Sequence, residues 1–120
     1  MATRSTRGIE AVWLETHNWG RTARFFQMLG YELEFETGHR SGQFRNGEGP
    51  YVFVAEVPED QPTATRLVFG VDDAGALDLA SGIEVVSPFE PTHWDTQEMT
   101  VRDPDGRLWS LQAPAPAAPS

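Results

Sequence analysis

Two stretches of this chain follow the same plan, in which a strand is followed by a helix and then by three more strands. In the first stretch, side-chain character alternates over residues 11–16, and this period of two predicts a strand with two distinct faces. Asn18 can cap a helix that runs to about Leu29, and Gly30 stands where helices often end in the left-handed conformation. Three further strands are predicted at residues 31–36, where the alternation is strict, and at residues 43–45 and 51–55.

The second stretch repeats this order with a weaker helix. Residues 66–71 are predicted to form a strand, and the two aspartates that follow can start a short helix to about Ala80. The alignment of the two stretches places Arg45 over Arg102 at the turn before each last strand. The sequence therefore predicts an α+β fold of two β-α-β-β-β modules, the second with its remaining strands at residues 83–86, 98–101 and 107–112.

The length of 120 residues suits a single domain, which we expect at residues 8–112 with modules at about 8–57 and 65–112. Residues 1–7 are expected to be a disordered N-terminus. The tail at residues 113–120 is rich in alanine and proline, and it is expected to be disordered because it cannot pack. The chain has no cysteine, which excludes a disulfide scaffold, thiolate metal sites and cysteine nucleophiles and is compatible with the cytoplasmic location that we expect.

The net charge of −9 limits the classes of partner. An acidic surface repels phosphate backbones, so nucleic acid is not expected as a partner, whereas a ligand with a cationic part would be favoured. The same charge can equally serve only to keep the protein soluble. No segment approaches the roughly 18 apolar residues that a membrane span requires, so no membrane association is expected either.

Two motifs on the repeated module point to a known fold. Residues 25–31 (FFQMLGY) resemble the helix ending F-Y-x-x-L-G-F of the vicinal oxygen chelate superfamily, and residues 102–107 (RDPDGR) resemble its turn R-D-P-D-G-N. This superfamily includes glyoxalase I, extradiol dioxygenases and bleomycin-resistance proteins, and the resemblance covers about residues 8–112. It implies a mixed sheet in which the two modules curl into a U-shaped cleft. A second copy often completes such a cleft, so the resemblance also implies a homodimer.

The resemblance also locates the four cleft positions at which the superfamily's enzymes hold a metal ion. In this chain they carry Ala11, Phe53, Arg66 and Ser110. Alanine and phenylalanine have no donor atom, serine is a weak donor, and the permanent charge of arginine repels a cation. A site for a divalent ion needs two or more converging imidazole or carboxylate groups. We therefore expect no metal and no other cofactor, and we expect surface histidines at the three positions His17, His39 and His93.

Strand parity predicts the side chains that face the cleft. Trp13 is a large aromatic residue on a face that an enzyme would keep polar. Rings that flank a cleft can form a stacking slot for a flat, conjugated ligand, and polar groups such as Glu15, Arg66 and Ser110 can orient it. With two residues from segments that border the cleft in relatives, Phe44 and Trp94, the expected ligand-binding residues are Trp13, Glu15, Phe44, Tyr51, Phe53, Arg66, Trp94, Leu108 and Ser110.

These features favour a binding protein of the bleomycin-resistance type over an enzyme. Such a protein would sequester an aromatic natural product, as in antibiotic self-resistance, without catalytic residues or covalent chemistry. The alternative is a lyase-like or dioxygenase-like enzyme of the same superfamily that is metal-free or uses an atypical metal set. A third interpretation is a small subunit or regulatory domain whose cleft is filled by its own side chains.

Overall fold

The computed structural model describes residues 6–79, 82–92 and 94–116. Internal contacts divide the chain into a first unit, residues 10–67, and a second unit, residues 1–9 and 68–120. Among the described residues, no helix has the length and hydrophobicity that crossing a membrane would take. The elements along the chain are β1 (Ile9–Thr16), α1 (Trp19–Met28), β2 (Glu32–Glu36), β3 (Ser41–Arg45), β4 (Tyr51–Glu56), β5 (Thr65–Gly70), the 3-10 turn η1 (Ala74–Ala76), β6 (Glu84–Pro91), β7 (Thr96–Arg102) and β8 (Leu108–Pro114).

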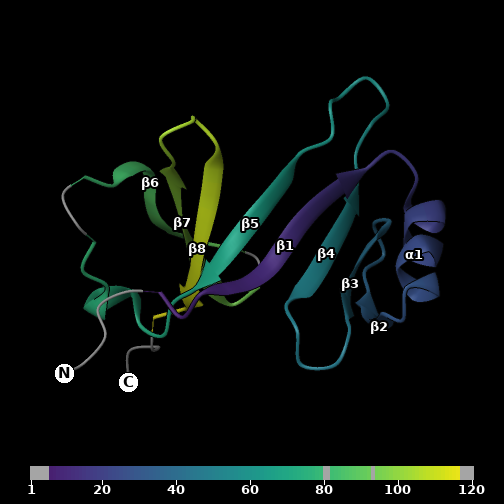
Figure 1. The fold of residues 1–120 in the computed structure, drawn as a ribbon, viewed down its shortest axis with the longest axis horizontal. Helices are drawn as coiled ribbons and strands as arrows, with labels where there is room; N and C mark the ends of the chain where they lie inside the picture. Colours follow the sequence, from purple (N-terminus) through teal and green to yellow (C-terminus); the bar gives the residue numbers. More distant parts are fainter. Residues whose placement is uncertain (1–5, 80–81, 93, 117–120) are drawn as a thin grey trace. The chain divides into compact units, whose positions relative to one another are not determined.

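The same strand order occurs once in each unit. In the first unit the order is β2-β3-β4-β1, with β1 parallel to β4 and β3 antiparallel to both of its neighbours (Figure 1). In the second unit the order is β5-β8-β7-β6, with β5 parallel to β8 and β7 antiparallel to both of its neighbours. Each of these four-strand groups therefore mixes parallel and antiparallel pairs, and the chain has the predicted α+β class.

The repeat extends to side-chain contacts. In the first unit, Arg45 Nη1 donates to the Gly49 carbonyl at 3.2 Å. In the second unit, Arg102 Nη1 donates to the Gly106 carbonyl at 3.5 Å. The two arginines are the residues that the sequence alignment superimposes, so the structure confirms that alignment.

The predicted start and end of α1 are confirmed. Asn18 Oδ1 accepts the backbone N–H of Arg21 at 3.0 Å, and Gly30 follows the helix with a φ of 96°. One side of the helix packs on the sheet of the first unit, because the apolar residues of the strands and of the helix each gather on one face. The core consists of the buried Phe44, Val52 and Val54 with Val12, Leu14, Trp19, Ala23, Phe26, Tyr31 and Leu33 around them.

The strict alternation predicted for residues 31–36 is interrupted by a bulge. Leu33 lies opposite Phe44 in the register of β2 and β3, but Phe35 lies opposite Gln43, so the register shifts by one residue between Leu33 and Phe35. A bulge adds one unpaired residue and reverses the direction of the side chains that follow it. Leu33 therefore packs under α1, whereas Phe35 turns to the opposite face of the sheet.

Gly42 is required where β3 passes between the helix and the bulge. A Cβ at this position would lie 2.8 Å from both the Phe35 carbonyl oxygen and a ring carbon of Trp19. We therefore expect Gly42→Ala to lower the free energy of unfolding by about 1–3 kcal/mol, the usual effect of overpacking a core. Chemical denaturation would measure it. Gly38→Ala is the matched control, because a Cβ there would meet no atom of the described residues within 4 Å. Equal stabilities of the two variants would contradict this packing.

The helix predicted in the second module at residues 72–80 is wrong. The described part of this segment contains only η1, where Asp73 Oδ1 accepts the Gly75 N–H at 2.9 Å as an N-terminal cap. Glycine disfavours a helix interior, and so short a segment cannot offset the cost of helix nucleation. The helix end expected at Ala80 lies outside the described residues. The core of this unit consists of Val71, Leu111 and Ala113 with Phe69, Ala74, Leu77, Leu79, Phe89, Met99 and Val101 around them.

The strand predicted at residues 83–86 is longer than expected. β6 continues to Pro91 and contains two register shifts, one between Val85 and Ser87 and one between Ser87 and Glu90. Proline cannot donate to a neighbouring strand, so within sheets it occurs at edges and bulges. β6 is the edge strand of the second unit's sheet, which explains how it accommodates proline.

Both limits of the folded part differ from the prediction. The tail expected from residue 113 begins later, because β8 continues to Pro114 and the Ala115 N–H donates to the Asp95 carbonyl at 3.2 Å. At the other end, the Arg7 N–H donates to the Gly70 carbonyl at 2.7 Å. Strand pairing orders these residues even though their composition suggests a loop. The disorder expected for residues 1–5 and 117–120 falls outside the described residues.

Asp103 organises the turn before β8. Its carboxylate accepts hydrogen bonds from Arg107 Nε at 2.8 Å and from Trp109 Nε1 at 2.9 Å. Arg107 first, and then Trp109, hold the pKa of Asp103 well below its ordinary value of 3.8. A lowered pKa means that the folded state favours the ionised form, so this contribution to stability is complete above the pKa of the unfolded state. It is lost as the pH falls from there toward the folded-state pKa.

Asp103→Asn should therefore lower the midpoint of thermal unfolding at pH 7. The difference from the original chain should shrink as the pH falls below about 4, where the carboxyl of the unfolded chain becomes protonated. Thermal unfolding followed by circular dichroism between pH 2 and 7 would measure both curves. A difference that stays constant over this range would contradict the role given to the ionised carboxylate.

Candidate functional site

Three aromatic side chains meet on the face of the first unit's sheet that α1 does not cover. Trp13 on β1 and Phe53 on β4 lie opposite each other in register, and their rings stack at 5.3 Å between centroids with an angle of 6°. Phe35 on β2 lies 6.2 Å from Phe53, with an angle of 52° between the rings. We call Trp13, Phe35 and Phe53 the aromatic platform.

The platform differs from the slot expected from the sequence. Parallel rings 5.3 Å apart are already in contact, so a ligand ring cannot lie between Trp13 and Phe53. A ligand can only stack on the outer side of the platform. Phe53 is 9% exposed and Phe35 is 41% exposed, so Phe35 offers the larger accessible surface.

Phe35 is the site residue that sequence reasoning missed. In the sequence, Tyr31, Leu33 and Phe35 alternate with glutamates, which assigns all three to the helix-covered face. The bulge between Leu33 and Phe35 moves Phe35 to the opposite face. The hydrophobic pattern contains no sign of this bulge, because the alternation itself is perfect.

Glu15 borders the platform at one end. Its Oε2 accepts the indole Nε1–H of Trp13 at 3.3 Å, and its Oε1 accepts the backbone N–H of Ala64 at 3.0 Å. Both carboxylate oxygens are therefore engaged within the first unit. Each oxygen thus has one donor, and a ligand would meet Glu15 at its remaining acceptor sites.

A second polar group lies beside the platform. Glu34 accepts hydrogen bonds from Gln43 Nε2 at 2.9 Å and from Arg45 Nε at 3.1 Å. The bond from Gln43, followed by the bond and charge of Arg45, keeps the pKa of Glu34 below its ordinary value. The Arg45 guanidinium also lies 5.4 Å from the centre of the Tyr51 ring, a cation–π distance. Tyr51 precedes Phe53 by two residues on β4 and so points to the same face of the sheet, with one ring face next to an arginine.

Phe44 does not belong to this face, so its expected place at the edge of the ligand site is wrong. It is fully buried in the core under α1, with its ring centroid 5.7 Å from those of both Trp19 and Phe26. Residues 43 and 44 point to opposite faces because successive side chains of a strand alternate. Gln43, rather than Phe44, shares a face with the platform.

The other expected site residues are distributed over both units. Arg66 lies at the start of β5 within the first unit and is half-buried. Ser110 is fully buried on β8 of the second unit, in register with Val68 and Thr100. Leu108 lies opposite Arg102 in the same unit. Trp94 is 53% exposed. The first unit therefore brings together Trp13, Glu15, Tyr51 and Phe53 of the nine expected residues.

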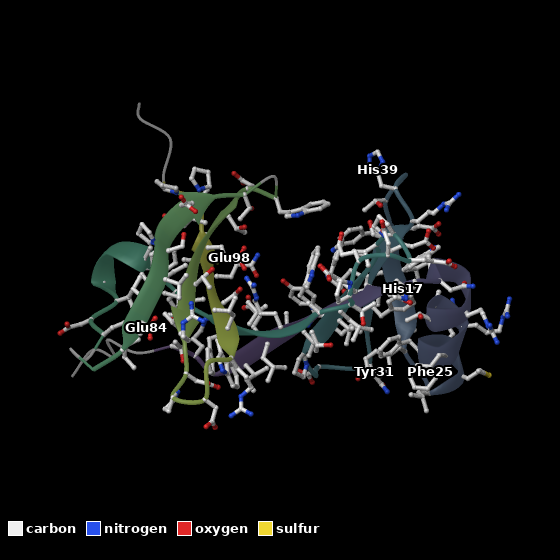
Figure 2. The ribbon with its side chains drawn as sticks, turned by 90° about the horizontal axis from the view of Figure 1, so that it is seen from above. His17, Phe25, Tyr31, His39, Glu84 and Glu98 are labelled. Carbon is white, nitrogen blue, oxygen red and sulfur yellow. The ribbon has the colours of Figure 1, made fainter. Side chains whose placement is uncertain are left out.

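The second unit carries small residues where the first has its platform. The register that pairs Trp13 with Phe53 pairs Val68 with Ser110. Ser87, which follows the first register shift of β6, takes the place of Phe35. Polar residues continue this face, including Glu98 (Figure 2), which lies in register with Glu90 and Gln112. The aromatic platform is thus a property of the first module's sequence and is not shared by these equivalent positions.

The donor set at the four metal positions does not fit a divalent ion. Ala11 and Phe53 provide no donor atom, and Arg66 is a cation. Among the described residues, no three or more His, Cys, Asp or Glu side chains lie close enough together to hold a metal ion. His17 and His39 occupy separate connections of the first unit (Figure 2), and His17 Nε2 lies 2.7 Å from the Gln61 carbonyl oxygen. His93 lies outside the described residues.

Comparison with solved structures shows which known proteins share the fold of this chain. No protein-family model and no curated protein sequence matches the chain. Methylmalonyl-CoA epimerase from Mycobacterium tuberculosis is similar with a TM-score of 0.75 and 17% identity, over 97% of this chain and 93% of the other. A glyoxalase/bleomycin resistance protein/dioxygenase superfamily member from Vibrio splendidus is similar with a TM-score of 0.65 and 15% identity, over 88% of this chain and 98% of the other.

The Mn(II)-bound glyoxalase from Novosphingobium aromaticivorans gives a TM-score of 0.64 with 15% identity, and the match covers 97% of this chain but 43% of that one. At identities this low the likeness concerns the fold and leaves the chemistry of the site open. The resemblance that the two sequence motifs indicate is confirmed at this level. The chain therefore has the fold of the glyoxalase/bleomycin resistance protein/dioxygenase superfamily.

Proposed function

We propose that this chain binds an aromatic small molecule by stacking it on the aromatic platform and releases it chemically unchanged. The observation that carries the proposal is the parallel contact of Trp13 and Phe53, extended by the exposed ring of Phe35. Phe35 is exposed and Trp13 is half-buried, and covering the exposed parts of these rings with a flat ligand removes apolar surface from water. A flat aromatic natural product of the antibiotic type, which the protein would sequester for self-resistance, is a ligand of this class.

The polar groups beside the platform favour binding over catalysis. A general acid or base works best when its pKa lies near the working pH. The pKa of Glu34 is instead lowered by Gln43 and Arg45, and both oxygens of Glu15 are engaged. The similar structures include enzymes as well as the superfamily member from Vibrio splendidus, so the fold itself is compatible with either class.

Titration calorimetry with planar tricyclic compounds tests the proposal. We expect saturable binding, with one site per chain, of acridone or of its cationic relative proflavine, and mass spectrometry should recover the compound unchanged. A saturated, non-planar analogue such as perhydroacridine is the control and should not bind. Failure of all planar compounds in such a panel to bind, or their conversion by catalytic amounts of protein, would overturn the proposal.

Metal content separates this proposal from the enzymatic alternative. Protein purified without chelators would be analysed for Zn, Fe, Mn and Ni. A stoichiometric metal that survives gel filtration would favour an enzyme with an atypical ligand set. The homodimer expected from the sequence remains a prediction, which sedimentation equilibrium of the purified chain would test.

A further inference from the structure

Glu15 connects the platform to the chain segment that follows β4. Its carboxylate bridges the Trp13 indole N–H and the backbone N–H of Ala64, a residue 49 positions away. The backbone N–H of Glu15 also donates to the carbonyl of Ala64 at 2.9 Å. Glu15 is thus fixed by its backbone and by one carboxylate oxygen, and its other oxygen is held against the indole.

We infer that Glu15 is a positioning residue, which holds the Trp13 indole parallel to Phe53, and that the platform therefore selects a planar ring system irrespective of cationic charge. This inference rests on the proposed function and names the class of ligand. An indole that can rotate about its side-chain bonds loses that freedom when a ligand stacks on it. A hydrogen bond that fixes the ring beforehand removes this penalty.

A direct ion pair between Glu15 and a ligand cation is the competing explanation. The Trp13 and Ala64 N–H groups occupy one acceptor site on each carboxylate oxygen, so a ligand cation would share Glu15 with both donors. The nearby Glu34 likewise accepts hydrogen bonds from Gln43 and Arg45. These bonds to the protein are the observation that favours a positioning role, and the substitutions below distinguish it from an ion pair.

Two substitutions of Glu15 distinguish its role in positioning the Trp13 indole from a direct effect of its negative charge on the ligand. Glu15→Gln keeps the length of the side chain but has one acceptor, so its amide NH2 must face one of the two donors. Glu15→Asp keeps the charge but is one methylene shorter, so it cannot span both donors. Under the positioning role, both substitutions should weaken binding of acridone and of proflavine by a similar factor, about fivefold to tenfold. Glu48→Gln, at an exposed position in the turn before β4, is the control for loss of charge.

A double-mutant cycle with Trp13→Phe gives the second readout. Phenylalanine has no N–H for Glu15 to hold, so adding Glu15→Gln to Trp13→Phe should change the affinity by less than about twofold. The indole N–H resonance of Trp13, identified by its absence from Trp13→Phe, should move in Glu15→Gln more than those of the other tryptophans. This measurement needs no ligand.

The outcomes distinguish the two proposals. A loss of affinity for proflavine alone in Glu15→Gln, with Glu15→Asp retaining that affinity, would show a direct ion pair and overturn the inference. An unmoved Trp13 resonance would overturn it as well. If neither acridone nor proflavine binds the original chain, the proposed function fails. The shift of the Trp13 indole N–H resonance in Glu15→Gln still decides whether Glu15 orients Trp13.

Discussion

Phe44→Ala should lower the free energy of unfolding by about 3–5 kcal/mol, the range found for removing a fully buried phenylalanine. The ring is completely buried and contacts both Trp19 and Phe26, so it joins the sheet of the first unit to α1. Native domains are stable by only about 5–15 kcal/mol, so the variant should lose a large part of its stability. Urea denaturation followed by far-UV circular dichroism would measure the change.

Phe25→Ala is the matched control for this prediction. The same side chain is removed from α1, but Phe25 is 51% exposed, so the loss of stability should be much smaller. Figure 2 shows Phe25 close to Tyr31, and both rings contact Phe26 at 5.3 Å between centroids. If Phe44→Ala were as stable as Phe25→Ala and instead lost ligand affinity, Phe44 would lie at the binding face and our placement of it would be wrong.

Trp13→Ala should reduce the affinity for a planar ligand about 30-fold or more, the effect expected when a central aromatic contact is removed. The substitution removes the ring that stacks on Phe53 and also the donor that Glu15 holds. Since Trp13 is itself a fluorescence reporter, the affinity should be measured by calorimetry or by the anisotropy of proflavine. Phe25→Ala, on the helix-covered side of the same sheet, should leave the affinity unchanged.

The result that would contradict this prediction is a folded Trp13→Ala protein with unchanged affinity. Folding is checked by the far-UV spectrum and by the cooperativity of thermal unfolding. Retained affinity would place the ligand elsewhere, and Trp94 of the second unit would be the next residue to replace. A parallel loss of affinity in Phe35→Ala would support the platform as a single surface.

The sequence was sufficient for the elements whose causes are local. The Asn18 cap, the Gly30 helix end and the turn at residues 103–106 each depend on a few neighbouring residues, and all three are observed. The internal repeat was also detectable, because strand periodicity and turn residues recur in order. The second helix was overestimated, since its capping aspartate was clear but the residues after Asp73 do not sustain a helix.

Parts of the candidate site could be predicted and others could not. Trp13 and Phe53 share a face because of strand parity and parallel pairing, and parity is visible in the sequence. Phe44 was misassigned because the resemblance placed its segment at the cleft. Parity alone predicts that its side chain and that of Gln43 point to opposite faces of the sheet. The partner of Glu15, the Ala64 N–H, lies 49 residues further along the chain and has no local signature.

By itself, the sequence determined the order of the strands in each module, the faces of β1 and β4, and the absence of metal-ligating side chains at the four positions that the resemblance indicates. Only the tertiary structure decided that Phe35 joins Trp13 and Phe53, that these rings form one surface, and that Glu15 holds the indole. Periodicity and capping are short-range effects written in neighbouring residues. The bulge in β2 depends instead on how β3 and α1 pack against it, with Gly42 leaving the space for Trp19.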